Sequence, residues 1–395
     1  MREMRTKFTL WVFLCVAGCA VGESDKENKD KSEVPEDNNT SAGNDPNELF
    51  FGQGHWPGAD VDVEQKREKI IEFLNESSGE RILSGQESML WDVPWESFYP
   101  SSRDEYVSGM TGEVPAVFSS DFGDFNLEEM QGANNQPATL EDLRRARSKV
   151  VDMSKAYSER GSIVMLSHHM CQPDVEDGCS YETMSAFDYD NRYPDWKIDQ
   201  MLTPDTNLHS VLMERLDEIA GYLKQLQDDG VVVLWRPYHE NNMPWFWWGS
   251  NPRSGELFRQ MHDRFEHHHG LQNLIWVYSA NYWTEDFQHP RRYFPGQFYV
   301  QVYGIDLYQE HGHQYEKRIH DSLLELAEWS QPIALTEIGS PPENWERFRA
   351  DQSQWAFWTT WWNYELNWTP TNYQEAYGHS DTFERLDLPN DWFNQ

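Results

Sequence analysis

Residues 231–240, with the sequence VVVLWRPYHE, decide the fold. The run from Val231 to Tyr238 is short enough for one strand and opens with five consecutive large apolar side chains. An uninterrupted apolar run of this length is typical of a strand covered on both faces, as in parallel sheets flanked by helices. The segment then becomes polar and ends in Glu240. It therefore predicts a buried parallel strand with a carboxylate at its carboxyl end.

Runs of the same kind recur along the chain and alternate with segments of helical period, as expected of repeated βα units. The predicted strands are Arg81–Gly85, Val114–Phe118, Ser162–Ser167, Val231–Tyr238, Leu274–Asn281, Phe298–Gly304, Pro332–Ile338 and Ala356–Trp362. The predicted crossover helices are Glu64–Leu74, Leu140–Tyr157, Leu208–Leu226, Glu256–Glu266 and Tyr315–Trp329. Neither GxGxxG nor GxxxxGK[ST] occurs, which disfavours an open nucleotide-binding sheet. We therefore predict an α/β fold, a closed (β/α)8 TIM barrel that forms one catalytic domain over residues 49–395.

The N-terminus is predicted to be an export signal followed by a tether. Residues 1–18 have a basic start and an apolar core, and they lead into Val16-Ala17-Gly18-Cys19, which resembles the lipobox of bacterial lipoproteins. Cys19 is therefore the predicted lipidation site, with cleavage and no lipid as the alternative. Residues 19–48 are acidic and nearly devoid of apolar side chains, which predicts a solvated tether. We expect an exported protein that is lipid-anchored to the cell envelope. The residue after Cys19 is Ala20 rather than Asp, which resembles the sorting signal for the outer membrane, so we expect the anchor at the outer membrane or cell surface.

Two cysteines lie close together in the predicted folded part, Cys171 and Cys179. In an exported chain such a pair favours a disulfide. Two free thiols are the alternative, and the spacing does not match a CxxC metal motif.

Charge and composition narrow the classes of partner. The 395 residues include 67 acidic and 32 basic side chains, giving a formal net charge of −35. This charge disfavours nucleic acid as a partner and opposes self-association, so we expect a monomer. The 19 Trp, 18 Tyr and 20 Phe residues supply flat surfaces suited to sugar rings. Beyond the N-terminus no apolar run is long enough to cross a bilayer, so membrane contact is expected only through the N-terminal lipid.

Two carboxylates at the ends of predicted strands form the candidate catalytic pair. Glu240 follows the fourth run, and Glu337 lies at the end of the seventh. In a (β/α)8 barrel the carboxyl ends of the strands meet at one face, where catalytic groups gather. Cleavage of a glycosidic bond needs one protonated carboxyl for the leaving oxygen and one carboxylate beneath the anomeric carbon. We assign Glu240 as the general acid and base and Glu337 as the nucleophile.

Longer motifs around these positions resemble glycoside hydrolase family 26, whose members are chiefly endo-β-1,4-mannanases. The main motif is Arg236-Pro237-Tyr238-His239-Glu240 followed by Trp245-Phe246-Trp247-Trp248-Gly249. Further matches are Leu83-Ser84-Gly85-Gln86, Ser167-His168-His169 with Pro173, and Gly304-Ile305-Asp306-Leu307-Tyr308. The resemblance covers about residues 65–365. It implies a retaining (β/α)8 enzyme with its acid/base on strand four and its nucleophile on strand seven, which are the positions of Glu240 and Glu337.

The resemblance also implies substrate-binding roles for polar residues. Arg236 and Tyr308 would hold the nucleophile by hydrogen bonds. His239 would orient the acid/base region, and His169 would contact the sugar at the point of cleavage. The structural alternatives are an ordinary buried ion pair for Arg236 and a satisfied core histidine for His169.

Aromatic residues are implied as sugar contacts in the same way. Trp245 would wall the subsite at the cleavage point, and Trp361 would stack on a sugar ring. Trp362 could exchange roles with Trp361. Simple packing is the alternative for each tryptophan.

Together these features predict a retaining endo-β-1,4-mannanase that hydrolyses mannan, glucomannan or galactomannan by double displacement, with no cofactor and no catalytic metal. The same chemistry on β-1,3-xylan or mixed-linkage β-glucan is an alternative, because the catalytic groups do not read the C2 epimer alone. A non-catalytic, surface mannan-binding lipoprotein is a second alternative. Such a protein would keep the aromatic residues but would need no carboxylate pair.

Two histidine motifs do not predict a metal site. His239-Glu240 lacks the second histidine of HExxH, because Met243 stands in its place. His267-His268-His269 are adjacent residues at one helix end, and their side chains point in different directions. They are interpreted as a solvated helix terminus.

Overall fold

The computed structural model describes residues 62–88, 103–124, 140–175, 193–308, 316–361 and 370–389. The predicted signal, lipidation site and tether at residues 1–48 lie outside the described residues, as do Cys179 and Trp362. None of the helices within the described ranges combines the length and the apolar character needed to cross a bilayer.

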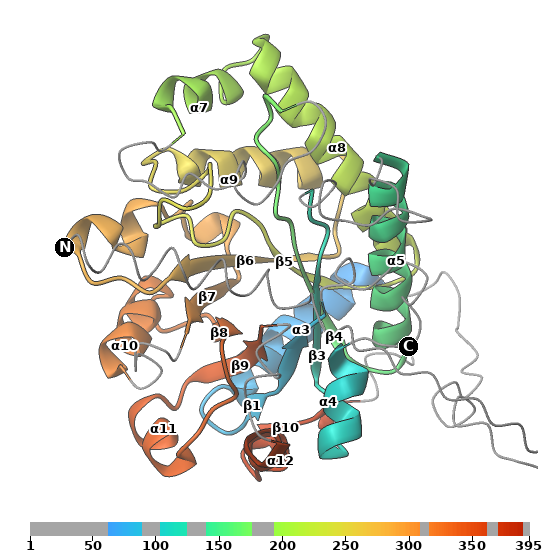
Figure 1. Ribbon diagram of the computed structural model, residues 1–395, viewed down its shortest axis with the longest axis vertical. Coiled ribbons are helices and arrows are strands. Elements are labelled where there is room, and N and C mark those ends of the chain that lie inside the picture. The colour runs from blue at the N-terminus through green and yellow to red at the C-terminus, as the bar shows by residue number, and fades with distance from the viewer. Residues whose placement is uncertain are drawn as a thin grey trace, which may run out of the picture. The chain divides into compact units, whose positions relative to one another are not determined.

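The strands form one closed, all-parallel barrel (Figure 1). The barrel strands are β1 Ile82–Leu83 with β2 Gly85–Glu87, β3 Val117–Asp121, β4 Ile163–Ser167, β5 Val233–Arg236, β6 Leu274–Asn281, β7 Val302–Leu307, β8 Ile333–Ile338 and β9 Trp355–Thr360. β1 and β2 are two parts of the first barrel strand, separated by Ser84. Neighbouring strands pair in order from β2 to β9, and β9 also pairs with β2, which closes the ring. Every predicted strand overlaps an observed one, so the (β/α)8 fold is confirmed.

Several strands begin later than the sequence predicted, and the differences are largest for β3 and β7. β3 begins at Val117, and β7 begins at Val302 rather than Phe298. The first aromatic residues of the predicted run instead form the 3₁₀ helix η6, Gln297–Tyr299, in which the Phe298 side chain is exposed. The predicted apolar run therefore included residues of the turn before β7 as well as residues of the strand.

A short strand, β10 Thr382–Phe383, extends the sheet next to β1 and was not predicted, because two residues show no period. It pairs with β1 in parallel, with Ile82 opposite Thr382. The Arg81 side chain donates to the Thr382 carbonyl and forms an ion pair with Asp387 at 2.7 Å. Residues from the two ends of the described chain are thus held side by side.

Helices surround the barrel (Figure 1). The α-helices are α3 Val63–Ser77, α4 Arg103–Thr111, α5 Leu140–Glu159, α7 Asp195–Met201, α8 Asn207–Asp228, α9 Ser254–Asp263, α10 Lys317–Leu326, α11 Trp345–Asp351 and α12 Pro370–Tyr377. Other turns are the π-helix η3 Arg264–His268 and the 3₁₀ helices η4 Asp286–Gln288, η5 Pro290–Arg292 and η10 Arg385–Asp387. The helices α3, α5, α8, α9 and α10 match predictions. The short helices α4, α7, α11 and α12 were missed, since none sustains a long helical period.

The barrel interior changes from apolar to polar along the strands. At the amino ends, Ile70 and Leu74 of α3 join one buried cluster with Val117, Leu234 and Ile275 of the strands. Toward the carboxyl ends the buried side chains become polar or charged. They include Ser119, Asp121, Ser167, Arg236, Ser279, Asp306, Thr336 and Glu337. The apolar layers exclude water from one half of the barrel, and the charged strand residues named above lie toward its carboxyl edge.

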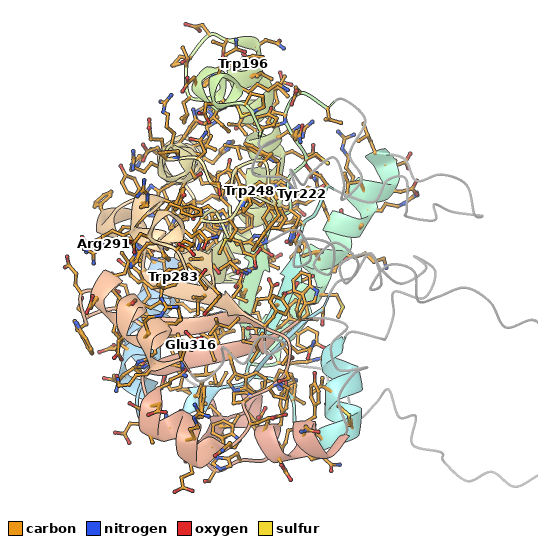
Figure 2. All side chains as sticks on the ribbon, turned by 60° about the vertical axis from the view of Figure 1, so that its left-hand side comes forward. Trp196, Tyr222, Trp248, Trp283, Arg291 and Glu316 are labelled. Atoms are coloured by element: carbon orange, nitrogen blue, oxygen red, sulfur yellow. The ribbon has the colours of Figure 1, made fainter. Side chains whose placement is uncertain are left out.

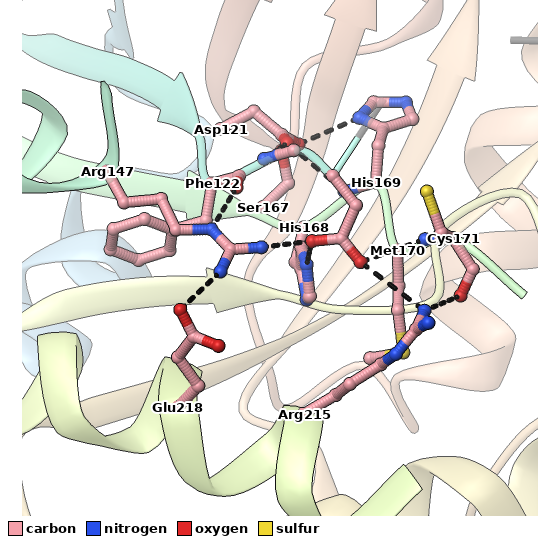
Figure 3. A network of polar contacts seen from close by, with 12 residues as sticks. Asp121, Phe122, Arg147, Ser167, His168, His169, Met170, Cys171, Arg215 and Glu218 are labelled. Atoms are coloured by element: carbon pink, nitrogen blue, oxygen red, sulfur yellow. Dashed lines mark hydrogen bonds and ion pairs between the residues drawn. The ribbon is translucent and has the colours of Figure 1, made fainter. Parts of the chain in front are cut away.

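A buried ionic network ties the ends of β3 and β4 to the helices α5 and α8 (Figure 3). The Asp124 carboxylate accepts hydrogen bonds from Arg147 and, at 2.8 Å, from His168 Nε2. Arg147 also donates to the Phe122 carbonyl at 2.9 Å and to Glu218 at 3.0 Å. Burial opposes ionisation of Asp124, but His168 and Arg147 hold its pKa well below the usual range. The network fixes the segment after β4, which carries the predicted site residue His169.

We expect Arg147→Met to lower the free energy of unfolding by about 3–5 kcal/mol, because it leaves buried acceptors without their cation. The matched control is Arg144→Met on the same helix. Arg144 contacts the same Glu218, but its side chain is 61% exposed whereas that of Arg147 is 6% exposed, so the control should cost less than about 1 kcal/mol. Urea unfolding followed by tryptophan fluorescence measures both values. Equal losses in the two variants would contradict the role given to the buried network.

Candidate active site

The loop after β5 holds Glu240 in a constrained backbone conformation. Tyr238 and Glu240 have positive φ angles of 46° and 55°, which cost free energy for residues other than glycine. The Glu240 amide donates to the Ser279 carbonyl on β6 at 2.8 Å. The indole of Trp248, which lies deep among the side chains in Figure 2, donates to the His239 carbonyl at 2.8 Å. These bonds keep the Glu240 side chain directed over the carboxyl end of the barrel.

Gly249 is required in the same loop. A Cβ at this position would lie 1.9 Å from the Met243 carbonyl oxygen, a contact that no side chain can tolerate. The close approach of the chain at residue 249 to the Met243 carbonyl therefore requires glycine.

Glu240 and Glu337 meet at the carboxyl edge of the barrel with a third carboxylate, Asp306. One oxygen of each residue lies within 4.8 Å of the others, and all three side chains are buried. A short separation of about 5–5.5 Å between carboxyl groups is typical of retaining glycosidases, and about 6.5–9.5 Å of inverting ones. Carboxyl oxygens within 4.8 Å of each other fit the shorter of these spacings.

Both carboxylate oxygens of Glu337 accept hydrogen bonds. Arg236 donates to Oε2 at 2.7 Å, and the Tyr308 hydroxyl donates to Oε1. Arg236 also donates to Asp306, which in turn accepts from Ser279 at 2.9 Å. Burial raises the pKa of Glu337 to about 7, and the Asp306 charge adds to the rise, while Arg236 and Tyr308 oppose it.

Glu240 has a different environment. Asn281 donates to Oε1 at 2.6 Å, and the Trp245 indole donates to Oε2. Burial raises the pKa of Glu240 well above its usual range, and the charges of Asp306 and Glu337 raise it further. No cation contacts Glu240 as Arg236 contacts Glu337 in the described part of the chain, so Glu240 is the member of the pair that keeps a proton more firmly.

Behind the carboxylates, Asp121, His169 and His239 form a buried chain of hydrogen bonds. The Asp121 carboxylate accepts from His169 Nδ1 at 2.8 Å and from the His169 amide at 3.1 Å. His169 Nε2 faces His239 Nε2 at 3.0 Å. Burial lowers the pKa of His239 well below its usual value, with Arg236 contributing. One proton between the two Nε2 atoms can therefore link the rings, and the Asp121 carboxylate fixes the orientation of His169.

The predicted aromatic residues flank this group. Trp245 and Trp361 are both half-buried and pack on the main core. The Trp361 amide donates to the Ile338 carbonyl at 2.8 Å, and its ring centroid lies 6.2 Å from that of His169. The tryptophan predicted as its alternate, Trp362, lies outside the described residues.

The structure therefore brings together all eight residues predicted for catalysis and sugar binding. Cys171 is disulfide-bonded, but its predicted partner Cys179 falls in a range that is not described, so that pairing stays a prediction. Glu240, Asp306 and Glu337 have the donor set of a metal site. The Arg236 guanidinium donates to two of these carboxylates and supplies a compensating positive charge.

Sequence reasoning missed Asp306, Asn281, Asp121 and Glu87, which are all buried or half-buried at the carboxyl ends of strands. Burial raises the pKa of Glu87 to about 8, and its carboxylate accepts a hydrogen bond from the Ser119 hydroxyl. The signal that selected Glu337, a polar residue at the end of an apolar run, was also present at Asn281 and Asp306, whereas Glu87 and Asp121 follow polar residues and gave no such signal.

Several known proteins are similar to this chain in sequence and in fold. A mannan endo-1,4-beta-mannosidase of Thermothelomyces thermophilus is 27% identical over 330 residues, which cover 82% of this chain and 61% of the relative. A Bacillus subtilis enzyme with the same name is 30% identical over 279 residues, 67% of each chain. GH26A from a Muricauda species has a TM-score of 0.68 at 29% identity, covering 84% of this chain and 99% of that one.

This chain thus spans about three fifths of the length of the Thermothelomyces relative and about half of a Piromyces mannan endo-1,4-beta-mannosidase A, of which 48% is covered. The sequence model of glycosyl hydrolase family 26 matches residues 59–384, which include every strand of the barrel. The chain belongs to glycosyl hydrolase family 26.

Proposed function

We propose that the protein is a retaining endo-β-1,4-mannanase. The observation that carries the proposal is the buried pair of carboxyl groups, Glu240 and Glu337, with oxygens within 4.8 Å of each other. Family membership and the relatives named mannan endo-1,4-beta-mannosidase support mannan as the substrate.

The two glutamates have complementary roles in the proposed double displacement. Glu240, with the more strongly raised pKa, protonates the leaving glycosidic oxygen while Glu337 attacks the anomeric carbon. Glu240, now ionised, then removes a proton from the water that hydrolyses the glycosyl-enzyme. Arg236 and Tyr308 keep Glu337 oriented for attack. No metal and no cofactor take part in this scheme.

The remaining predicted residues are proposed to bind the sugar. His169 and His239 present a fixed pair of rings beside the carboxylates, and Trp245 and Trp361 supply half-exposed indole faces. The same machinery acting on β-1,3-xylan or mixed-linkage β-glucan is the alternative activity, because none of these groups reads only the C2 configuration.

The experiment that tests the proposal is reducing-end release from mannan, glucomannan, xylan and lichenan. We expect release from the first two substrates, with a fast fall in viscosity that marks internal cleavage. Glu337→Ala should lower kcat about a thousandfold or more, because the lost group acts on the transition state, while mannohexaose binding persists. Glu346→Ala, an exposed residue of α11, is the matched control. Binding of mannan by the wild type without reducing-end release would favour the non-catalytic alternative, and preferred cleavage of xylan or lichenan would overturn the substrate assignment.

The pH dependence of kcat/KM provides a second test. The active form has Glu240 protonated and Glu337 ionised, so activity falls in acid as Glu337 gains a proton and in base as Glu240 loses one. Tyr308→Phe removes the hydroxyl that stabilises the ionised Glu337, which raises the pKa of that carboxyl. We expect the acid limb of the profile to move to higher pH while the basic limb changes little. An acid limb that stays in place or moves to lower pH would contradict the assignment of Glu337.

We propose, from the sequence alone, that the protein is exported and lipid-anchored at the outer membrane or cell surface through Cys19, after removal of residues 1–18. We propose also that the folded part is monomeric and that Cys171 pairs with Cys179. The acidic composition and the lipobox-like sequence support these assignments.

Labelling with radioactive palmitate in a bacterial host with two membranes tests the anchor. The wild-type chain and Cys15→Ala should carry label and enter the detergent phase of a Triton X-114 extract, because Cys15 leaves with the signal. Cys19→Ala should lose both properties. Label retained by Cys19→Ala would rule out this anchor.

A further inference from the structure

A second cluster of potential ligands lies at the junction of α9 and η3, outside the active-site residues. It consists of His262, Asp263 and His267, whose donor atoms all lie within 4.8 Å of one another. The π-helical turn explains the grouping, because a wider turn of the backbone places residues five positions apart on one face. The ring centroids of His262 and His267 are 6.2 Å apart.

The spacing of the donor atoms matches a small cation. His262 Nδ1 lies 3.3 Å from Asp263 Oδ1, and His267 Nε2 lies 3.8 Å from the same oxygen. Ligands about 2.0–2.2 Å from a tetrahedral Zn²⁺ are about 3.3 Å apart. The first pair has this separation, and the second needs a shift of only a few tenths of an ångström, which the exposed His267 can make.

The buried member of the cluster is oriented by its surroundings. The His262 side chain is 4% exposed and packs between Trp276 and Tyr299, each with a ring centroid 4.9 Å away. Its second nitrogen, Nε2, lies 3.6 Å from a carboxylate oxygen of Glu266, which accepts a hydrogen bond from the Trp276 indole at 2.8 Å. A carboxylate behind the distal nitrogen is the usual support of a metal-binding histidine, because it fixes the ring and the proton position.

The other two members face solvent. The side chains of Asp263 and His267 are 53% and 68% exposed, so an ion can enter and water can complete its coordination. One fixed ligand and two adjustable ones, with one carboxylate and two imidazoles, suit Zn²⁺ and related first-row divalent ions.

We propose that His262 Nδ1, an Asp263 oxygen and His267 Nε2 bind one Zn²⁺-class ion, which clasps the end of α9 and takes no part in hydrolysis. The neighbouring group Asp217, His268 and His269 is a weaker candidate. Asp217 already accepts two hydrogen bonds from the Arg264 guanidinium, at 2.8 and 2.7 Å, and one contact from His269. An ion there would have to displace a bound cation.

The test uses the full mature chain without a polyhistidine tag, after treatment with EDTA, titrated with ZnCl₂ by calorimetry at pH 7.5 and followed by thermal unfolding. We expect one ion per chain and an increase in Tm. His267→Ala and Asp263→Asn should each weaken binding at least tenfold. His268→Ala, at the adjacent position but in the other group, is the matched control and should bind like the wild type.

Three results would overturn the proposal. They are absence of stoichiometric binding to the wild type below about 100 µM Zn²⁺, a His267→Ala variant that binds like the wild type, and a loss of binding in His268→Ala instead. A fourth variant, Glu337→Gln, tests for an ion held by the carboxylates of the active site, and loss of Zn²⁺ binding in that variant would also overturn the proposal. Mannan hydrolysis should be unchanged by Zn²⁺ removal, so the result does not depend on the proposed activity.

Discussion

The candidate site depends on one buried cation, the guanidinium of Arg236. Three carboxyl groups converge within 4.8 Å at the carboxyl edge of the barrel, and both their burial and their mutual repulsion oppose ionisation unless a positive charge compensates it. Arg236 is buried and donates to both Asp306 and Glu337, but not to Glu240 among its described contacts. This asymmetry gives otherwise similar glutamates different affinities for a proton. The chemistry proposed for the pair follows from that difference.

The barrel interior is divided into an apolar zone and a polar zone, and the buried charged groups of the site lie in the polar zone. Apolar side chains from α3 and from the amino halves of the strands exclude water, and the polar groups occupy the opposite end. Since β5, β7 and β8 are parallel, residues distant in sequence, such as Arg236 and Glu337, arrive at the same edge with no further device. Hydrogen bonds from neighbouring strands then satisfy each carboxylate.

The fold and the principal site residues could be predicted from the sequence because both produce local signals. Buried parallel strands are continuous apolar runs, and Glu240 and Glu337 end two of them. The limits of prediction have equally physical causes. Phe298 and Tyr299 are aromatic yet belong to a 3₁₀ turn, since side-chain polarity does not report backbone hydrogen bonding. The Asp121–His169 contact could not be predicted, because pairing between two strand ends depends on the register of the sheet.

The π-helical turn η3 is a second feature that side-chain polarity did not predict. The three adjacent histidines were expected to point in different directions, but donor atoms of His268 and His269 lie within 4.8 Å of each other and of Asp217. His267 belongs to the other group, because the wider turn aligns it with His262, five positions earlier. Local backbone geometry, which composition does not encode, decides which donors can cooperate.

The pairing of β10 with β1 has a consequence for biosynthesis. The first barrel strand is bordered by residues 382 and 383, and Arg81 is secured by a carbonyl and a carboxylate from the same late segment. While the chain is still on the ribosome, this side of the first strand has nothing to pair with, so the sheet cannot be completed until nearly all of the polypeptide has been made.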